Sequence, residues 1–67
     1  MIPVNSSNLV SVGYEPASMK LYIQFKQGLY VYYSVPQHTY DGLMSAASHG
    51  KYHAAYIKNS FPYSRVA

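Results

Sequence analysis

A two-residue alternation between residues 19 and 26 constrains the fold of this chain more than any other feature. Leu21, Ile23 and Phe25 alternate there with mainly polar side chains. Successive side chains of a β-strand point to opposite faces, so the pattern predicts a strand with one apolar and one polar face. A helix with a single apolar stripe would need a period of 3.6 residues instead.

A second β-rich run, residues 29–35, follows after a short joint that contains glycine, which predicts a hairpin. With a two-residue loop at positions 27 and 28, Phe25 lies opposite Tyr30 and Ile23 lies opposite Tyr32. Both tyrosines then face the core, where an unpaired hydroxyl would cost roughly 1–3 kcal/mol. A slip of one residue would turn both rings to the other face.

Three further segments complete the expected fold. Residues 9–14 are β-rich and end at a proline-containing turn, which predicts the first strand. Apolar side chains at helical spacing predict a helix over 37–48, and Gly50 is the expected stop before a second, short helix over 51–59. The expected fold class is α+β: a three-stranded antiparallel meander sheet followed by two helices packed on one face, in a single domain spanning 1–67.

The chain has 67 residues and no cysteine, so a small core must form without disulfides. Nine tyrosines supply much of the large apolar surface. Sharing this core across a symmetric interface would add burial, which makes a homo-oligomer an expectation. No run of residues is long and apolar enough for a bilayer, and the N-terminus does not resemble a secretion signal, so a cytoplasmic location is expected, with no membrane partner.

Residues suited to catalysis are few. Glu15 and Asp41 are the only carboxylates, and they fall in a predicted turn and a predicted helix. No serine lies in a nucleophile-elbow motif, and no glycine-rich phosphate loop is present. We therefore expect a protein that is not an enzyme, with no catalytic residues and no cofactor.

The three histidines, His38, His49 and His53, include a pair four residues apart. On a continuous helix such a pair would share one face, as metal ligands do. Gly50 lies between the two and is expected to interrupt the helix. The favoured interpretation is therefore surface histidines near helix ends and no metal site, and a hydrolase that combines them with Asp41 ranks last among the hypotheses.

Cationic and aromatic side chains are mixed in the last third of the chain: Lys51, Tyr52, Tyr56, Lys58, Tyr63 and Arg65. Lys51 and Lys58 stand seven apart and would share a helical face, with Arg65 folding back beside them. Such cations neutralise phosphate, and exposed tyrosine rings stack on bases at about 1–3 kcal/mol each. Alternatively, Tyr52 and Tyr56 form a core stripe and the lysines its solvated face; the spacing favours neither interpretation.

Several strings of the sequence resemble the KTSC domain family, named after a C-terminal domain of some lysyl-tRNA synthetases. The matching residues are Ser6-Ser7-Asn8, Val12-Gly13-Tyr14, Leu21-x-Ile23-x-Phe25, Gly28, Tyr30-Val31-Tyr32, Val35-Pro36, Ser48-x-Gly50-x-Tyr52, Ile57-Lys58, Phe61-Pro62 and Arg65. The resemblance implies a small bacterial or phage domain without established enzymatic activity, for which RNA binding has been suggested. Carried over by position, it adds Phe61 to the candidate site and supports Tyr52, Lys58 and Arg65.

The formal net charge of +3 favours an anionic partner. We expect a non-enzymatic protein that binds RNA or another phosphate-bearing nucleotide ligand through Lys51, Tyr52, Tyr56, Lys58, Phe61, Tyr63 and Arg65. The alternative is a phage-encoded, self-assembling protein that sequesters a host defence factor, with a host protein as partner, or a cyclic nucleotide signal.

Overall fold

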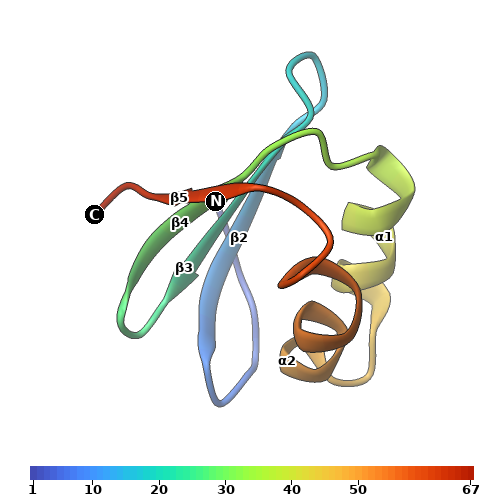
Figure 1. Ribbon diagram of the computed structural model, residues 1–67. Coiled ribbons are helices and arrows are strands. Elements are labelled where there is room, and N and C mark those ends of the chain that lie inside the picture. The colour runs from blue at the N-terminus through green and yellow to red at the C-terminus, as the bar shows by residue number, and fades with distance from the viewer.

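In the computed structural model, which describes residues 1–67, four strands precede the helices and one follows them (Figure 1). The elements are β1 (Ile2–Pro3), β2 (Leu9–Glu15), β3 (Lys20–Phe25), β4 (Gly28–Tyr32), α1 (Gln37–Ser45), α2 (His49–Tyr52), the π-helix η1 (His53–Ile57) and β5 (Tyr63–Arg65). All neighbouring strands pair antiparallel in the order β1-β2-β3-β4-β5, so the sheet is a meander.

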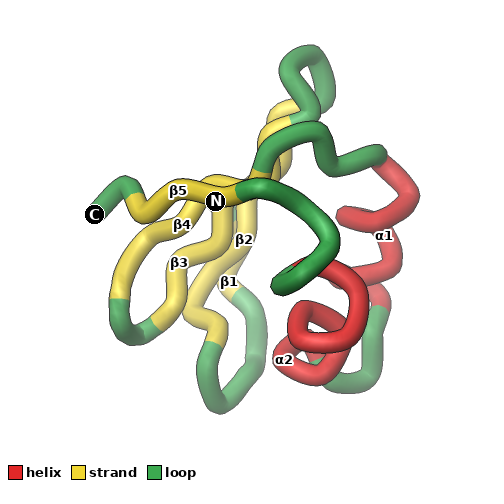
Figure 2. Tube along the Cα trace, in the orientation of Figure 1, coloured by secondary structure: helices red, strands yellow, loops and turns green.

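The sheet has five strands, so the prediction of three is wrong, while the α+β class is confirmed. The two missed strands lie at the sheet edges, β1 beside β2 and β5 beside β4 (Figure 2). With two and three residues, they are too short for a period to show. Their conformation is fixed by pairing with β2 and β4.

The β3–β4 hairpin is shifted by two residues from the predicted register. Ile23 pairs with Tyr30 and Leu21 pairs with Tyr32, because the turn is at residues 26–27 and Gly28 already belongs to β4. A shift of two residues keeps every side chain on its face. Tyr32 is accordingly 4% exposed and lies in the core, as predicted.

One hydrophobic core joins the inner face of the sheet to the helices. Its buried members are Leu9, Val12, Leu21, Ile23, Phe25, Tyr32, Val35, Leu43 and Ile57. Leu43 comes from α1 and Ile57 from η1, so both helical segments cover the same face of the sheet (Figure 1). None of the helices is long and apolar enough to cross a membrane.

The helical boundaries differ from the prediction. α1 ends at Ser45 rather than residue 48, and Gly50 lies inside α2 instead of stopping a helix. The reason is an N-cap, because the Ser48 hydroxyl accepts a hydrogen bond from the Lys51 backbone N–H. α2 then continues into η1, where the Lys58 backbone N–H donates to the His53 carbonyl at 2.9 Å.

Candidate ligand-binding pocket

A cavity of about 380 Å³ lies where β3, β4 and β5 meet the α2–η1 segment, and we call it the aromatic pocket. Its aromatic walls are Phe25, Tyr30, Tyr32 and Tyr63. Its polar lining consists of Asn8, Gln27, His53 and Lys58, and the small residues Gly50 and Ala54 complete it. The volume lies near the lower end of the roughly 300–1,000 Å³ that small-ligand sites span.

The aromatic walls form one connected cluster. Phe25 meets Tyr30 edge-on at 5.5 Å between ring centroids, and Tyr63 lies 5.9 Å from Tyr30 and 5.5 Å from Tyr32. Pairing in the sheet explains this arrangement, because Tyr32 is directly opposite Tyr63 on β5. Tyr63 remains 55% exposed, so its ring offers an accessible face at the cavity mouth.

A buried tyrosine–histidine pair lines the inner part of the pocket. The Tyr32 hydroxyl oxygen and His53 Nε2 share a hydrogen bond of 2.8 Å, and the two residues are 4% and 8% exposed. Burial, reinforced by the neighbouring phenols of Tyr63 and Tyr30, raises the pKa of Tyr32 to about 12. Burial, followed by the charge of Lys58, lowers the pKa of His53 below 6.5, so this imidazole is neutral at pH 7.

The charge in the aromatic pocket is positive. Lys58 contributes the cation, and none of the residues that line the cavity is acidic. Glu15 is engaged elsewhere, because its carboxylate accepts a hydrogen bond from the Ser18 hydroxyl at the end of β2, and Asp41 lies on α1. The pocket can therefore receive an anionic group without an opposing carboxylate.

The π-helix places two of these polar groups together. η1 begins at His53, and Lys58 is the residue whose backbone N–H closes its five-residue turn. Turns of this kind occur often at functional sites, because the extra residue changes which side chains share a face. The π turn rotates the residues that follow it around the helix axis, which explains why Lys58 lines the pocket while Lys51, seven residues earlier, does not.

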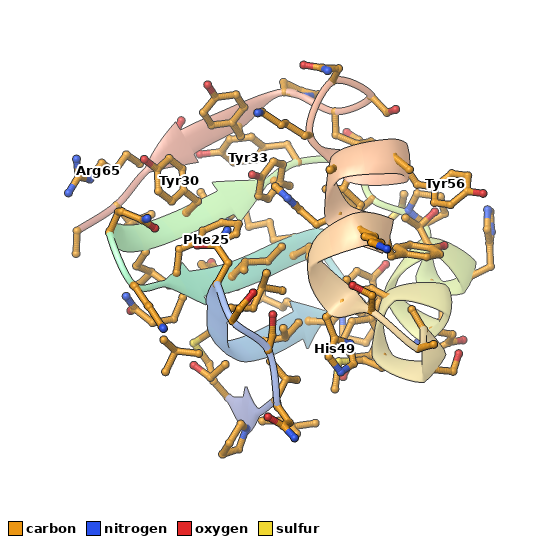
Figure 3. The ribbon with its side chains drawn as sticks, turned by 90° about the horizontal axis from the view of Figure 1, so that it is seen from below. Phe25, Tyr30, Tyr33, His49, Tyr56 and Arg65 are labelled. Atoms are coloured by element: carbon orange, nitrogen blue, oxygen red, sulfur yellow. The ribbon has the colours of Figure 1, made fainter.

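The seven residues predicted for the ligand site do not form one patch. Lys58 and Tyr63 line the aromatic pocket, whereas Phe61 packs against the core. Arg65 lies at the edge of the sheet, where its guanidinium donates to the Gln27 carbonyl at 2.8 Å. Figure 3 shows Arg65 and Tyr56 at opposite ends of the molecule, so the expectation that all seven residues converge on one patch is wrong.

Tyr52 and Tyr56 have different environments. Their rings are 4.7 Å apart, but Tyr52 packs against the core while Tyr56 is 60% exposed. The core-stripe interpretation therefore holds for Tyr52 only. Lys51 is exposed beside them, outside the cavity.

The interpretation of all three histidines as surface residues is wrong for His53. Its ring is buried against Phe25 at 4.9 Å and against Tyr32 at 5.5 Å. The His49 ring instead lies 2.8 Å from the Leu43 carbonyl through Nδ1, and His38 is exposed. Nowhere do three side chains of the metal-ligating types come together.

Sequence reasoning missed most of the pocket, whose polar lining includes Asn8, Gln27 and His53. The Tyr30-x-Tyr32 string was a usable signal, because both tyrosines were predicted on the inner face and buried tyrosine hydroxyls need partners. His53 is the partner of Tyr32, from 21 positions further along the chain.

The fold and the pocket define a class of small α+β domain in which a meander sheet and a helical pair enclose an aromatic cavity. A sequence profile of the KTSC domain family matches residues 5–61. A protein of Tsukamurella paurometabola is 39% identical over 62 residues, which cover 91% of this chain and 92% of that protein. The crystal structure of a KTSC domain protein from Yersinia pestis matches with a TM-score of 0.95 and 39% identity, over 97% of this chain and 93% of that one. The chain belongs to the KTSC domain family, as the resemblance implied.

Proposed function

We propose that the protein binds RNA or another phosphate-bearing nucleotide ligand, and that the aromatic pocket is the binding site. One observation carries the proposal: an open cavity combines accessible aromatic rings with a lysine and has no carboxylate in its lining. Aromatic rings bind bases in any sequence because every base has a π-face, and a cation is needed for the phosphate.

The rings differ in what they can contribute. Tyr63 is 55% exposed and is the ring best placed to stack on a base, which is worth about 1–3 kcal/mol. Tyr30 is half-buried and held edge-on by Phe25, so it supports the wall of the cavity. A base can therefore stack on Tyr63 without displacing the rings of Tyr30 and Phe25.

The phosphate contact is assigned to Lys58, whose side chain is exposed and lines the cavity. A lysine that neutralises a phosphate releases bound counterions, so affinity falls with salt. Asn8 and Gln27 add amide groups that can both donate and accept hydrogen bonds at the same cavity. Lys51 lies outside the pocket and carries the same charge, which makes it a matched control.

The test is a titration of fluorescent single-stranded RNA at several salt concentrations, with the wild type, Lys58→Gln and Lys51→Gln. We expect binding that weakens with salt, so that log affinity falls as log salt rises. In Lys58→Gln this slope should be shallower by about 0.7, the value for one phosphate on a single strand. Lys51→Gln should leave the slope nearly unchanged. Absence of binding at low salt and micromolar protein, or equal effects of the two variants, would overturn the proposal.

A further inference from the structure

The His53 ring has one nitrogen that the protein does not use. Its hydrogen bond to Tyr32 involves Nε2. No buried side-chain nitrogen or oxygen in the molecule lacks a hydrogen-bond partner, so Nδ1, which has none, must keep contact with solvent. His53 is 8% exposed and lines the aromatic pocket, the one pocket found in the molecule, so we place that contact at the pocket.

The bond to Tyr32 also fixes which nitrogen carries the hydrogen. Tyr32 remains a phenol at neutral pH, and an unprotonated imidazole nitrogen is a better acceptor than a phenol oxygen. We therefore assign the Tyr32 hydroxyl as the donor to Nε2, which places the hydrogen of the neutral ring on Nδ1. The free position of His53 is a hydrogen-bond donor at the cavity.

The size of the cavity limits the ligand. At about 380 Å³ the pocket has room for one small planar group among its rings but falls well short of the larger ligand sites. Phe25, Tyr32 and His53 are buried and packed edge-on, so they cannot separate to admit a second ring without disrupting the core. One base is therefore the unit that fits.

We infer that the aromatic pocket receives a single nucleobase, and that His53, oriented by Tyr32, is the specificity-determining residue that donates from Nδ1 to an acceptor on the edge of that base. This inference rests on the proposed function and deepens it. Tyr63 stacks on the base, Lys58 binds its phosphate, and His53 distinguishes bases by the acceptors that they present. The ligand class is a nucleoside monophosphate or one unstacked nucleotide of a single strand.

The test compares the four nucleoside 5′-monophosphates with ribose 5-phosphate, which carries the same phosphate without a base. Binding is followed by nuclear magnetic resonance titration of the wild type and of His53→Phe, which keeps an aromatic ring but removes both nitrogens. We expect the preferred nucleotide to bind about tenfold or more tightly than ribose 5-phosphate, as stacking predicts. In His53→Phe that nucleotide should lose about 2- to 10-fold in affinity, as for one hydrogen bond, with ribose 5-phosphate unchanged.

Tyr32→Phe is the second variant, because it leaves the His53 ring in place and removes only the group that orients it. We expect it to reduce the preference among the four nucleotides without abolishing stacking, and it carries the test if His53→Phe does not fold. If His53 has only a structural role, His53→Phe should weaken the binding of all four nucleotides and of ribose 5-phosphate equally. That result would overturn the inference.

The remaining outcomes separate this inference from the proposed function. If ribose 5-phosphate binds as tightly as the nucleotides, or if RNA binds and no mononucleotide does, the single-base site is refuted while RNA or phosphate binding stands. If neither RNA nor any mononucleotide binds, the proposed function fails and the inference fails with it.

Discussion

Replacing Tyr32 with phenylalanine removes one oxygen atom from the wall of the aromatic pocket and leaves the ring contacts in place. In the wild type that oxygen lies 2.8 Å from His53 Nε2. The ring also packs 5.5 Å from the rings of both His53 and Tyr63, and phenylalanine would keep these contacts. Tyr32→Phe therefore isolates the hydrogen bond.

The expected cost follows from the burial of His53. A buried polar group that loses its partner costs about 1–3 kcal/mol, and His53 is 8% exposed. Because the cavity can admit water to one side of the ring, we expect the lower half of this range, about 1–2 kcal/mol. For a domain of this size each kcal/mol lowers the Tm by about 4–8 °C, so the predicted decrease is roughly 4–16 °C.

Urea and thermal unfolding followed by circular dichroism would measure this decrease. Tyr22→Phe is the control, because Tyr22 is half-buried in β3 on the opposite face of the sheet, and its change should stay within about 0.5 kcal/mol. Adding His53→Phe to Tyr32→Phe should restore part of the lost stability, since no polar group then remains unpaired. A Tyr32→Phe variant as stable as the wild type would refute this account of the pair.

Three further predictions concern stability. The pKa of His53 is below 6.5 in the folded state, so the unfolded chain takes up a proton at a higher pH than the folded protein does. The free energy of unfolding should therefore fall as the pH drops from 6.5 through the folded pKa. Urea unfolding of His53→Phe should lack this part of the decrease. A Cβ at Gly28 would lie 2.6 Å from the Ala67 carbonyl oxygen, so Gly28→Ala should separate the chain end from β4 and accelerate hydrogen exchange of the Leu29 amide, which donates to that oxygen. Leu43→Ala should cost about 2–5 kcal/mol in urea unfolding because Leu43 is fully buried in the core; a loss below 1 kcal/mol would contradict the packing described.

The central strands were predictable because their side chains alternate over enough residues to show a period. The segments predicted at 9–14, 19–26 and 29–35 correspond to β2, β3 and β4. β1 and β5 were not predictable from local pattern, because two or three residues carry no period and their pairing depends on strands distant in sequence. The face of the hairpin was predicted correctly although its register was not, because the error was an even number of residues.

The candidate site was predictable only in part. Residue type identified Lys58 and Tyr63, since a cation and an aromatic ring suit a phosphate-bearing base, and the family resemblance also pointed to Lys58. The helix face on which Lys58 lies could not be inferred, because a helical wheel assumes 3.6 residues per turn and η1 inserts a π turn between Lys51 and Lys58. His53 was missed because its burial depends on Tyr32, which an isolated helix pattern does not contain.

The most direct test of the aromatic pocket as the ligand site is a titration of isotope-labelled protein with a short single-stranded RNA, followed residue by residue through amide chemical shifts. The largest changes are predicted at His53, Lys58 and Tyr63, which line the cavity. Largest changes at Tyr56 and Lys51, on the surface outside it, would contradict the account.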